Sequence, residues 1–178
     1  MKPPRVLVVF GSNLAPERNV RAAVEALHRD VGVVALSTVY RTAALGRPEQ
    51  PPFYNGALEL DTDLPPRVLK YGVLRPLEVA LGRVRTADRY AARTIDLDLA
   101  LYGDLVAATD DLVLPDPDIA TRPFLAVPLA EIAPDLPVPG TGQTLSQIAA
   151  EFAGAGLEPL VDYTRDLRRA IGHEPCPC

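Results

Sequence analysis

Apolar residues in the first third of the chain recur with strand-like and helix-like periods. Residues 5–10 form a continuous apolar run, which is typical of a central strand buried on both faces. The β-rich residues 31–40 predict a second strand. Between them we expect a helix over residues 16–29, whose apolar face consists of Val20, Ala23, Val24 and Leu27. The chain therefore opens with a strand–helix–strand unit.

A similar order follows in the middle of the chain. Residues 53–62 alternate weakly and predict a third strand, and residues 65–81 carry a helical apolar pattern. Pro76 lies inside that pattern and lacks a backbone donor, so we expect it to kink or split the helix. Residues 94–102 predict a fourth strand, and residues 105–108 are expected to return as a hairpin arm.

The last third of the chain has weaker periodicity. Residues 115–139 are rich in proline, so we expect irregular structure there with a short helix near residues 125–132. Another helix is expected over residues 144–152, and residues 154–178 are the least constrained by pattern. We therefore divide the chain into a domain of residues 1–153 and a C-terminal extension of residues 154–178.

The predicted order of strands and helices defines the fold class. Two strand–helix–strand halves favour an α+β, ferredoxin-like arrangement, in which an antiparallel sheet has two helices on one face. The 178 residues suffice to bury a core, and the net charge of −5 argues against a general nucleic-acid binder. No apolar run reaches the ~20 residues of a membrane span, and the N-terminus does not resemble a signal peptide. Cys176 and Cys178 form neither a good disulfide pair nor a zinc motif, so we expect a cytoplasmic protein.

Two aspartates in the fourth predicted strand carry the strongest chemical signal. Asp96 and Asp98 share one face of the strand, with Cα atoms about 6–7 Å apart. Carboxylates at this spacing can bind one hard cation or bridge two. For an isolated Asp-x-Asp, however, the more frequent explanation is the polar outer face of a half-buried strand.

An arginine-rich segment directly precedes these carboxylates. We call residues 82–93 the arginine loop; it contains Arg83, Arg85, Arg89 and Arg93. A planar guanidinium donates two hydrogen bonds to a phosphate at once, which favours a polyphosphate ligand. The alternative is a solvated basic loop, and the neighbouring carboxylates count against it, because arginine and metal together form a phosphoryl-transfer clamp.

A second segment could bind a flat heterocycle. Residues 41–52 lack regular periodicity, and the segment 41–55 combines apolar, amide and hydroxyl groups in Thr42, Leu45, Phe53 and Asn55. An ordinary surface loop explains the same residues equally well. For residues 11–13 we favour a turn with a helix cap, and for Glu78 a surface acid. His28 and His173 receive no role.

Several stretches together resemble the 6-hydroxymethyl-7,8-dihydropterin pyrophosphokinase family of folate biosynthesis. Their order and spacing hold across roughly residues 5–150, and the Arg-Thr-Ile-Asp-Leu-Asp sequence of residues 93–98 is highly specific among them. The matching stretches are residues 11–14, 37–42, 50–53, 55–57, 77–78, 82–85, 93–98, 122–125 and 128–134.

This resemblance implies a ferredoxin-like fold and transfer of pyrophosphate from ATP to the pterin hydroxymethyl group, leaving AMP. It implies that Asp96 and Asp98 hold two Mg²⁺ ions and that Arg83 and Arg93 clamp the transferring group. The residues implied to contact ATP are Arg75, Glu78, Arg85, Arg93 and Arg122. Those implied to line the pterin pocket are Thr42, Leu45, Phe53, Asn55, Tyr90 and Phe124. The implied partners are these small molecules, with no nucleic acid or membrane, and the expected state is a monomer.

The chain departs from the family pattern on the nucleotide side. Asp116 stands where the family usually has histidine, and Arg75 stands where an amide-type residue is common. Asp111 and Val113 replace more typical ATP-contacting residues, and Pro76 is unusual in its helix. These departures leave a second hypothesis open, a catalytically weakened pterin- or nucleotide-binding module on the same fold. A third, another aspartate–metal phosphoryl-transfer or hydrolytic enzyme, is disfavoured by the pterin-loop residues.

Overall fold

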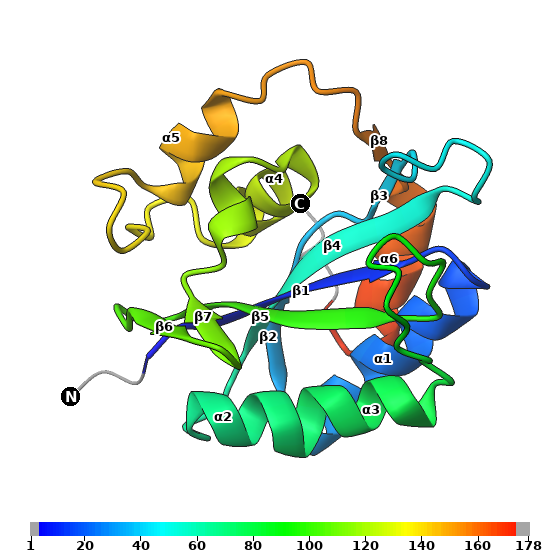
Figure 1. Ribbon diagram of the computed structural model, residues 1–178, viewed down its shortest axis with the longest axis horizontal. Coiled ribbons are helices and arrows are strands. Elements are labelled where there is room, and N and C mark those ends of the chain that lie inside the picture. Colours follow the sequence, from blue (N-terminus) through cyan, green and yellow to red (C-terminus); the bar gives the residue numbers. More distant parts are fainter. Residues whose placement is uncertain (1–3, 174–178) are drawn as a thin grey trace.

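A computed structural model describes residues 4–173 (Figure 1). An antiparallel sheet, whose strands differ in length, lies at the centre of the molecule. The strand order is β5-β1-β4-β3-β8, and β2 also pairs with β4. The strands are β1 (Val6–Ser12), β2 (Val33–Leu36), β3 (Tyr40–Thr42), β4 (Phe53–Leu60), β5 (Asp96–Tyr102) and β8 (Glu158–Pro159). The expected second strand is therefore divided into β2 and β3, which both pair with β4.

The continuous apolar run of β1 is explained by its position between β4 and β5. Val6, Val8 and Phe10 belong to one core cluster, whereas Leu7 and Val9 belong to a second cluster on the opposite face. Because successive side chains of a strand point to opposite faces, a strand covered on both sides must be apolar at every position. The prediction of a central strand here is confirmed.

Two helical crossovers cover the face of the sheet to which Val6, Val8 and Phe10 point. They are α1 (Pro16–Asp30) and a composite helix made of α2 (Pro66–Val68), the π-helical η1 (Leu69–Leu74) and α3 (Arg75–Ala80). The sequence led us to expect that Pro76 would kink or split this helix. The helix is not split, and a π-helical segment, Leu69–Leu74, directly precedes the turn that contains Pro76. The first crossover leads from β1 to β2, which pairs with β4, and the second leads from β4 to β5, which pairs with β1. This arrangement is the expected ferredoxin-like α+β fold.

Two further helices cover the opposite face, as Figure 1 shows above the sheet. They are α4 (Pro123–Ile132) and α5 (Leu145–Ala150). Thr144 caps α5, since its hydroxyl accepts the Gln147 N–H while the Gln147 side chain accepts the Thr144 N–H. Helices therefore lie on both faces of the sheet, beyond the two helices on one face that the sequence predicted.

The segment between β5 and α4 differs from the prediction. The expected hairpin arm does not return along β5; β6 (Ala107–Thr109) pairs with β7 (Leu112–Leu114) in a separate two-stranded sheet. The 3₁₀ helix η2 (Pro117–Ala120) then leads into α4. Within residues 4–173, no helix is long and apolar enough to cross a membrane.

The C-terminal segment packs onto the main core, although the sequence showed little constraint there. β8 pairs with β3, and α6 (Val161–Ala170) places Leu167 in the cluster that contains α1. The expectation of weak constraint is thus wrong for this segment up to residue 173, while a functional boundary after residue 153 stays a prediction. The two cysteines lie outside the described residues.

Candidate active site

The two predicted metal ligands lie on the expected face of β5. Leu97 and Leu99 are buried in the core on the α1 side, and Asp96 and Asp98 point to the opposite face. The side chains of Asp96 and Asp98 are 20% and 42% exposed, so both carboxylates are accessible. The alternation predicted from sequence is therefore confirmed.

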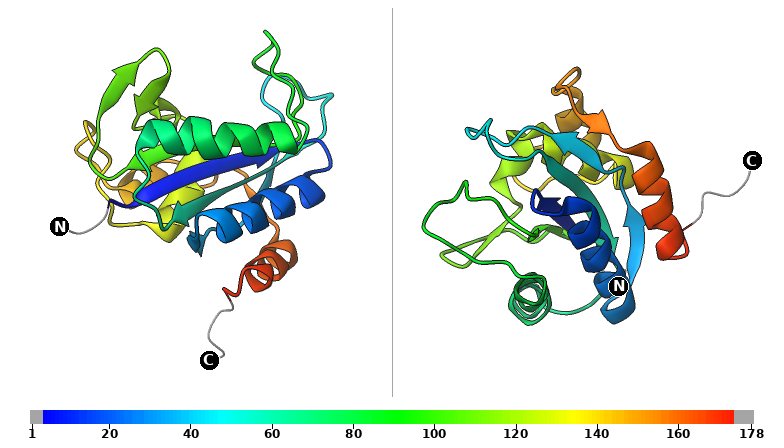
Figure 2. Two further views of the ribbon diagram at one scale, coloured as in Figure 1. Left: turned by 90° about the horizontal axis from the view of Figure 1, so that it is seen from below. Right: turned by 90° about the vertical axis from the view of Figure 1, so that its right-hand side faces the viewer.

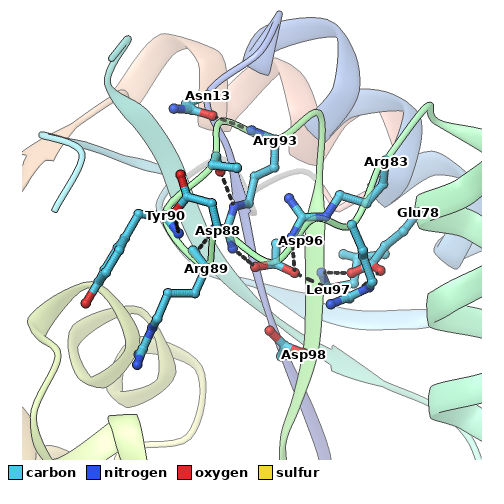
Figure 3. A network of polar contacts seen from close by, with 12 residues as sticks. Asn13, Glu78, Arg83, Asp88, Arg89, Tyr90, Arg93, Asp96, Leu97 and Asp98 are labelled. Atoms are coloured by element: carbon cyan, nitrogen blue, oxygen red, sulfur yellow. Dashed lines mark hydrogen bonds and ion pairs between the residues drawn. The ribbon is translucent and has the colours of Figure 1, made fainter. Parts of the chain in front are cut away.

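Arginines from the arginine loop surround Asp96 (Figure 3). The Arg93 guanidinium forms an ion pair with Asp96, and the Arg83 and Arg85 guanidinium groups lie 3.8 and 3.9 Å from it. Burial, together with the charges of Arg93 and Arg85, lowers the pKa of Arg83 below its ordinary value. The buried Arg83 Nε has no hydrogen-bond partner among the described residues. The site therefore contains a buried donor that the described protein groups leave unpaired.

Glu78 is a buried acid, so its interpretation as a surface residue is wrong. Its side chain is 1% exposed, and burial raises its pKa above the ordinary value. One oxygen accepts the Leu97 N–H at 2.8 Å and an Arg75 N–H at 2.6 Å, and the other accepts an Arg85 N–H at 2.8 Å. Glu78 thereby joins two arginines to the backbone between Asp96 and Asp98.

The residues that the family resemblance implied for the pterin pocket gather around one cavity of about 210 Å³. All six line it, namely Thr42, Leu45, Phe53, Asn55, Tyr90 and Phe124. The same cavity is lined by Arg93, Arg122 and both carboxylates of β5. An aromatic and amide surface thus lies in one hollow with the charged groups expected to bind phosphate.

A second hollow of about 260 Å³ adjoins this cavity. It is lined by Arg83 and Arg85, and it shares Arg93, Asp96 and Asp98 with the first cavity. Arg75 and Glu78 line a further hollow together with Arg83 and Arg85. The carboxylates therefore stand between an apolar-aromatic space and an arginine-rich space.

Gly11 creates room inside the first cavity, a role that the sequence did not reveal. In the sheet it lies between Asp96 of β5 and Asn55 of β4, directly opposite both. A Cβ atom on Gly11 would come within 2.9 Å of the Asn55 side-chain oxygen. Asn55 also donates to the Thr42 hydroxyl at 2.7 Å, which fixes its amide. The missing side chain leaves space between an amide and a carboxylate.

Asn13 connects the two loops that border the site, the arginine loop and the loop of residues 43–52 between β3 and β4. The two loops lie side by side in Figure 2. Its side-chain oxygen accepts the Arg93 N–H at 2.8 Å, and its amide nitrogen donates to Gln50 and to the Pro51 carbonyl, both at 3.2 Å. The predicted cap role is wrong, because α1 has no side-chain cap and the Ser12 hydroxyl donates to the Thr94 carbonyl. Only the tertiary contacts reveal this function.

Asp116, which replaces the histidine usual in the family, lines the first cavity together with Asp118. Its carboxylate accepts the Asp118 N–H at 2.9 Å. Burial, assisted by the negative charge of Asp98, raises the pKa of Asp116 to about 6. This acid is therefore half ionised in a pH range where ordinary aspartates are fully charged.

The residues present fit a hard divalent cation. Asp96 and Asp98 offer carboxylate oxygens on one strand face, but no group of three or more His, Cys, Asp or Glu side chains within residues 4–173 could enclose an ion. Mg²⁺ is commonly held by one or two carboxylates, with substrate phosphates and water completing its coordination. Fold and site together define a ferredoxin-like α+β protein equipped to bind a polyphosphate beside a planar acceptor.

Comparison with known proteins identifies the family. A family model described as 7,8-dihydro-6-hydroxymethylpterin-pyrophosphokinase matches residues 7–134, and the chain belongs to this family. It is 39% identical over 159 residues to 2-amino-4-hydroxy-6-hydroxymethyldihydropteridine pyrophosphokinase of Pseudomonas aeruginosa, covering 88% of this chain and 96% of the relative. The protein of the same name in Methylorubrum extorquens is 40% identical over 157 residues, covering 86% and 97% of the two chains.

Solved structures support the fold. A crystal structure of an HPPK-DHPS in complex with substrates matches with a TM-score of 0.67 at 10% sequence identity, covering 86% of this chain and 44% of that chain. A Plasmodium falciparum HPPK-DHPS with pteroate matches with a TM-score of 0.65 at 10% identity, covering 85% and 42%. This chain thus spans less than half of these longer proteins, and the likeness concerns the fold alone.

Proposed function

We propose that this chain transfers pyrophosphate from ATP to the hydroxymethyl group of 6-hydroxymethyl-7,8-dihydropterin, with release of AMP, in folate biosynthesis. Family membership supports this activity. The observation that carries it is the pair of adjoining hollows that share Arg93, Asp96 and Asp98. One hollow suits a planar ring and the other suits a polyphosphate, so the groups that can neutralise charge stand at their junction.

In the acceptor hollow, Phe53 offers an aromatic surface and the Asn55 amide, oriented by Thr42, offers hydrogen bonds to a ring edge. The hydroxymethyl oxygen would then attack the β-phosphorus in line. A bond forms between that oxygen and the β-phosphorus while the hydroxyl proton passes to water. The bond from the β-phosphorus to the oxygen of the α-phosphate breaks, and AMP leaves with the electron pair. Such a transfer requires positioning and charge neutralisation rather than a covalent protein intermediate.

The arginines would bind the transferring group and the nucleotide. Arg83, with its unpaired buried donor, and Arg93 are suited to the transferring phosphates, and Arg85 and Arg122 to the rest of ATP. Asp96 and Asp98 would hold Mg²⁺, two ions being expected, which supplies charge neutralisation on the phosphate oxygens. Tyr90, Leu45 and Phe124 would complete the walls around the pterin. The monomeric state and the cytoplasmic location stay predictions.

The test is AMP formation that requires ATP, Mg²⁺ and the hydroxymethylpterin together. We expect D96N and D98N each to lower kcat at least about 100-fold, because each removes charge from the proposed metal site. Their circular dichroism spectra should match the wild type, since both side chains are partly exposed. D104N, in the turn after β5, is the control and should keep normal turnover.

Substantial turnover in both D96N and D98N would contradict the metal assignment. Tight binding of pterin and nucleotide without any AMP would instead favour the weakened binding module.

A further inference from the structure

Arg75 makes a contact that distinguishes it from the other arginines of the site. One guanidinium nitrogen donates to Glu78 at 2.6 Å and to the Leu97 carbonyl at 3.0 Å. The other nitrogen donates to the Asp98 carboxylate at 2.8 Å. The Arg75 guanidinium thus neutralises Asp98 with one nitrogen, while Glu78 and the Leu97 carbonyl hold its other nitrogen. The charge of Asp98, although opposed by burial, raises the pKa of Arg75 above its ordinary value.

The cations beside Asp96 have a different kind of support. Arg83, Arg85 and Arg93 belong to the arginine loop, which contains no helix or strand. Arg75 begins the regular helix α3, and its side chain is only 20% exposed. A movement of the loop would therefore free Asp96, but it would leave the Arg75 guanidinium on Asp98.

We propose that Arg75 is a built-in counter-ion of Asp98 which excludes a free divalent cation there until a nucleotide phosphate takes over one of its nitrogens. The proposal rests on the proposed function, in which Asp98 is a metal ligand. The same carboxylate oxygen cannot hold both cations closely without strong repulsion. Glu78 and the Leu97 carbonyl hold the first nitrogen as a pivot. The rigid guanidinium can rotate about this pivot and move its second nitrogen from Asp98 to a phosphate.

The surroundings of Arg75 offer a suitable new partner for the second nitrogen. The hollow that Arg75 lines also contains the cations Lys70, Arg83 and Arg85 and the acids Glu78, Asp110 and Asp111. The cations outnumber the acids, so an anion bound there would meet a net positive charge. A phosphate of the nucleotide would accept from Arg75 and release Asp98 to the metal. Metal and nucleotide binding would then favour each other, and this coupling must be reciprocal.

The decisive measurement is Mn²⁺ binding to the nucleotide-free protein, followed by electron paramagnetic resonance. We expect R75Q to bind Mn²⁺ about 5- to 10-fold more tightly than the wild type, because the shorter, neutral amide removes the competing charge. R75Q should also bind metal-free α,β-methylene-ATP more weakly, because a phosphate contact is lost. A merely structural role for Arg75 would weaken both affinities, so the opposite changes are diagnostic.

R21Q is a matched control. Arg21 lies on α1, which packs against the face of the sheet opposite to the Asp96 and Asp98 side chains, and it forms an ion pair with Glu25 at 3.5 Å, so R21Q should bind Mn²⁺ as the wild type does. R75Q/D98N should lose the gained affinity. If R75Q does not fold, R75K serves instead; it keeps the charge without the two-nitrogen bridge, and an intermediate gain is expected.

Two results separate the failure of this inference from that of the proposed function. Mn²⁺ affinity in R75Q that equals the wild type, or a gain that persists in R75Q/D98N, overturns the role of Arg75 alone. Absence of Mn²⁺ binding to the wild type even with α,β-methylene-ATP overturns both the inference and the metal assignment.

Discussion

Four carboxylates near the site differ in what neutralises them. Glu78 is buried and paired with two arginines, and Asp96 is surrounded by side chains of the arginine loop. Asp98 pairs with a helix residue, Arg75, whereas Asp116 accepts a backbone N–H. A carboxylate that is buried with less compensating charge takes up a proton more readily. Asp116 is therefore the residue whose ionisation should respond most to mild changes of pH.

Replacement of Asp116 tests this environment through stability. The folded-state pKa of about 6 lies above the ordinary value, so the wild type is most stable, relative to D116N, below about pH 4. That relative stability is lost as the pH rises to about 6 and stays constant above it. The expected change between pH 4 and 7 is up to about 3 kcal/mol in favour of D116N, measured by urea unfolding. A difference between the two proteins that does not vary with pH would contradict the assignment.

The two loops at the site lack regular structure and depend on contacts with each other. Asn13, at the end of β1, connects Arg93 with Gln50 and Pro51. Further contacts join the loops directly, since Gln50 donates to the Tyr90 carbonyl and Arg47 pairs with Asp88. The position of the arginine loop is therefore set by neighbours distant in sequence, and loops of this kind often close over substrates.

Removal of the Asn13 side chain should release this connection. N13A loses the side-chain hydrogen bond that Asn13 accepts from the Arg93 N–H and those that it donates to Gln50 and Pro51, so amide hydrogen exchange in residues 82–93 should become faster. The Michaelis constants for both substrates should rise, while stability falls by about 1–2 kcal/mol. T86A is the control, because the Thr86 hydroxyl donates to the Asp88 carbonyl within the same loop at 3.3 Å and, among residues 4–173, to no residue outside it. Equal exchange rates in N13A and the wild type would disprove the connection.

The whole molecule depends on its C-terminal helix. α6 covers the interruption between β2 and β3, where the Arg168 guanidinium donates to the Leu36 carbonyl and the Thr164 hydroxyl accepts the Val39 N–H. Leu167 is fully buried in the core shared with β1 and α1. Leu167 and Ile171 are thus part of the hydrophobic core that supports the sheet, and Leu160 and Tyr163 pack against it.

Truncation of Leu167 measures this contribution. L167A should lower the free energy of unfolding by about 2–5 kcal/mol, since it removes buried methyl groups and leaves a cavity. V161A alters the same helix at a side chain that is 65% exposed, so its effect should stay within about 0.5 kcal/mol. Similar unfolding midpoints for L167A and V161A would show that α6 is not coupled to the core.

The pattern of apolar and polar residues along the chain predicted the main elements, the ferredoxin-like order and the shared face of Asp96 and Asp98. These are local properties, because the period of apolar residues reports which faces of a single element are buried. The composition of the loop before Asn55 suggested a site for a flat heterocycle, and the family resemblance added Tyr90 and Phe124 and specified a pterin. All six residues line one cavity.

Which charged groups pair and which polar residues are buried became visible only when the folded elements were in place. The pairing of Arg75 with Asp98, the burial of Glu78 and the tie made by Asn13 all join elements far apart in the chain. The packing of α6 is of the same kind. No local pattern records such partners, since burial and ion pairing depend on where the remaining elements lie.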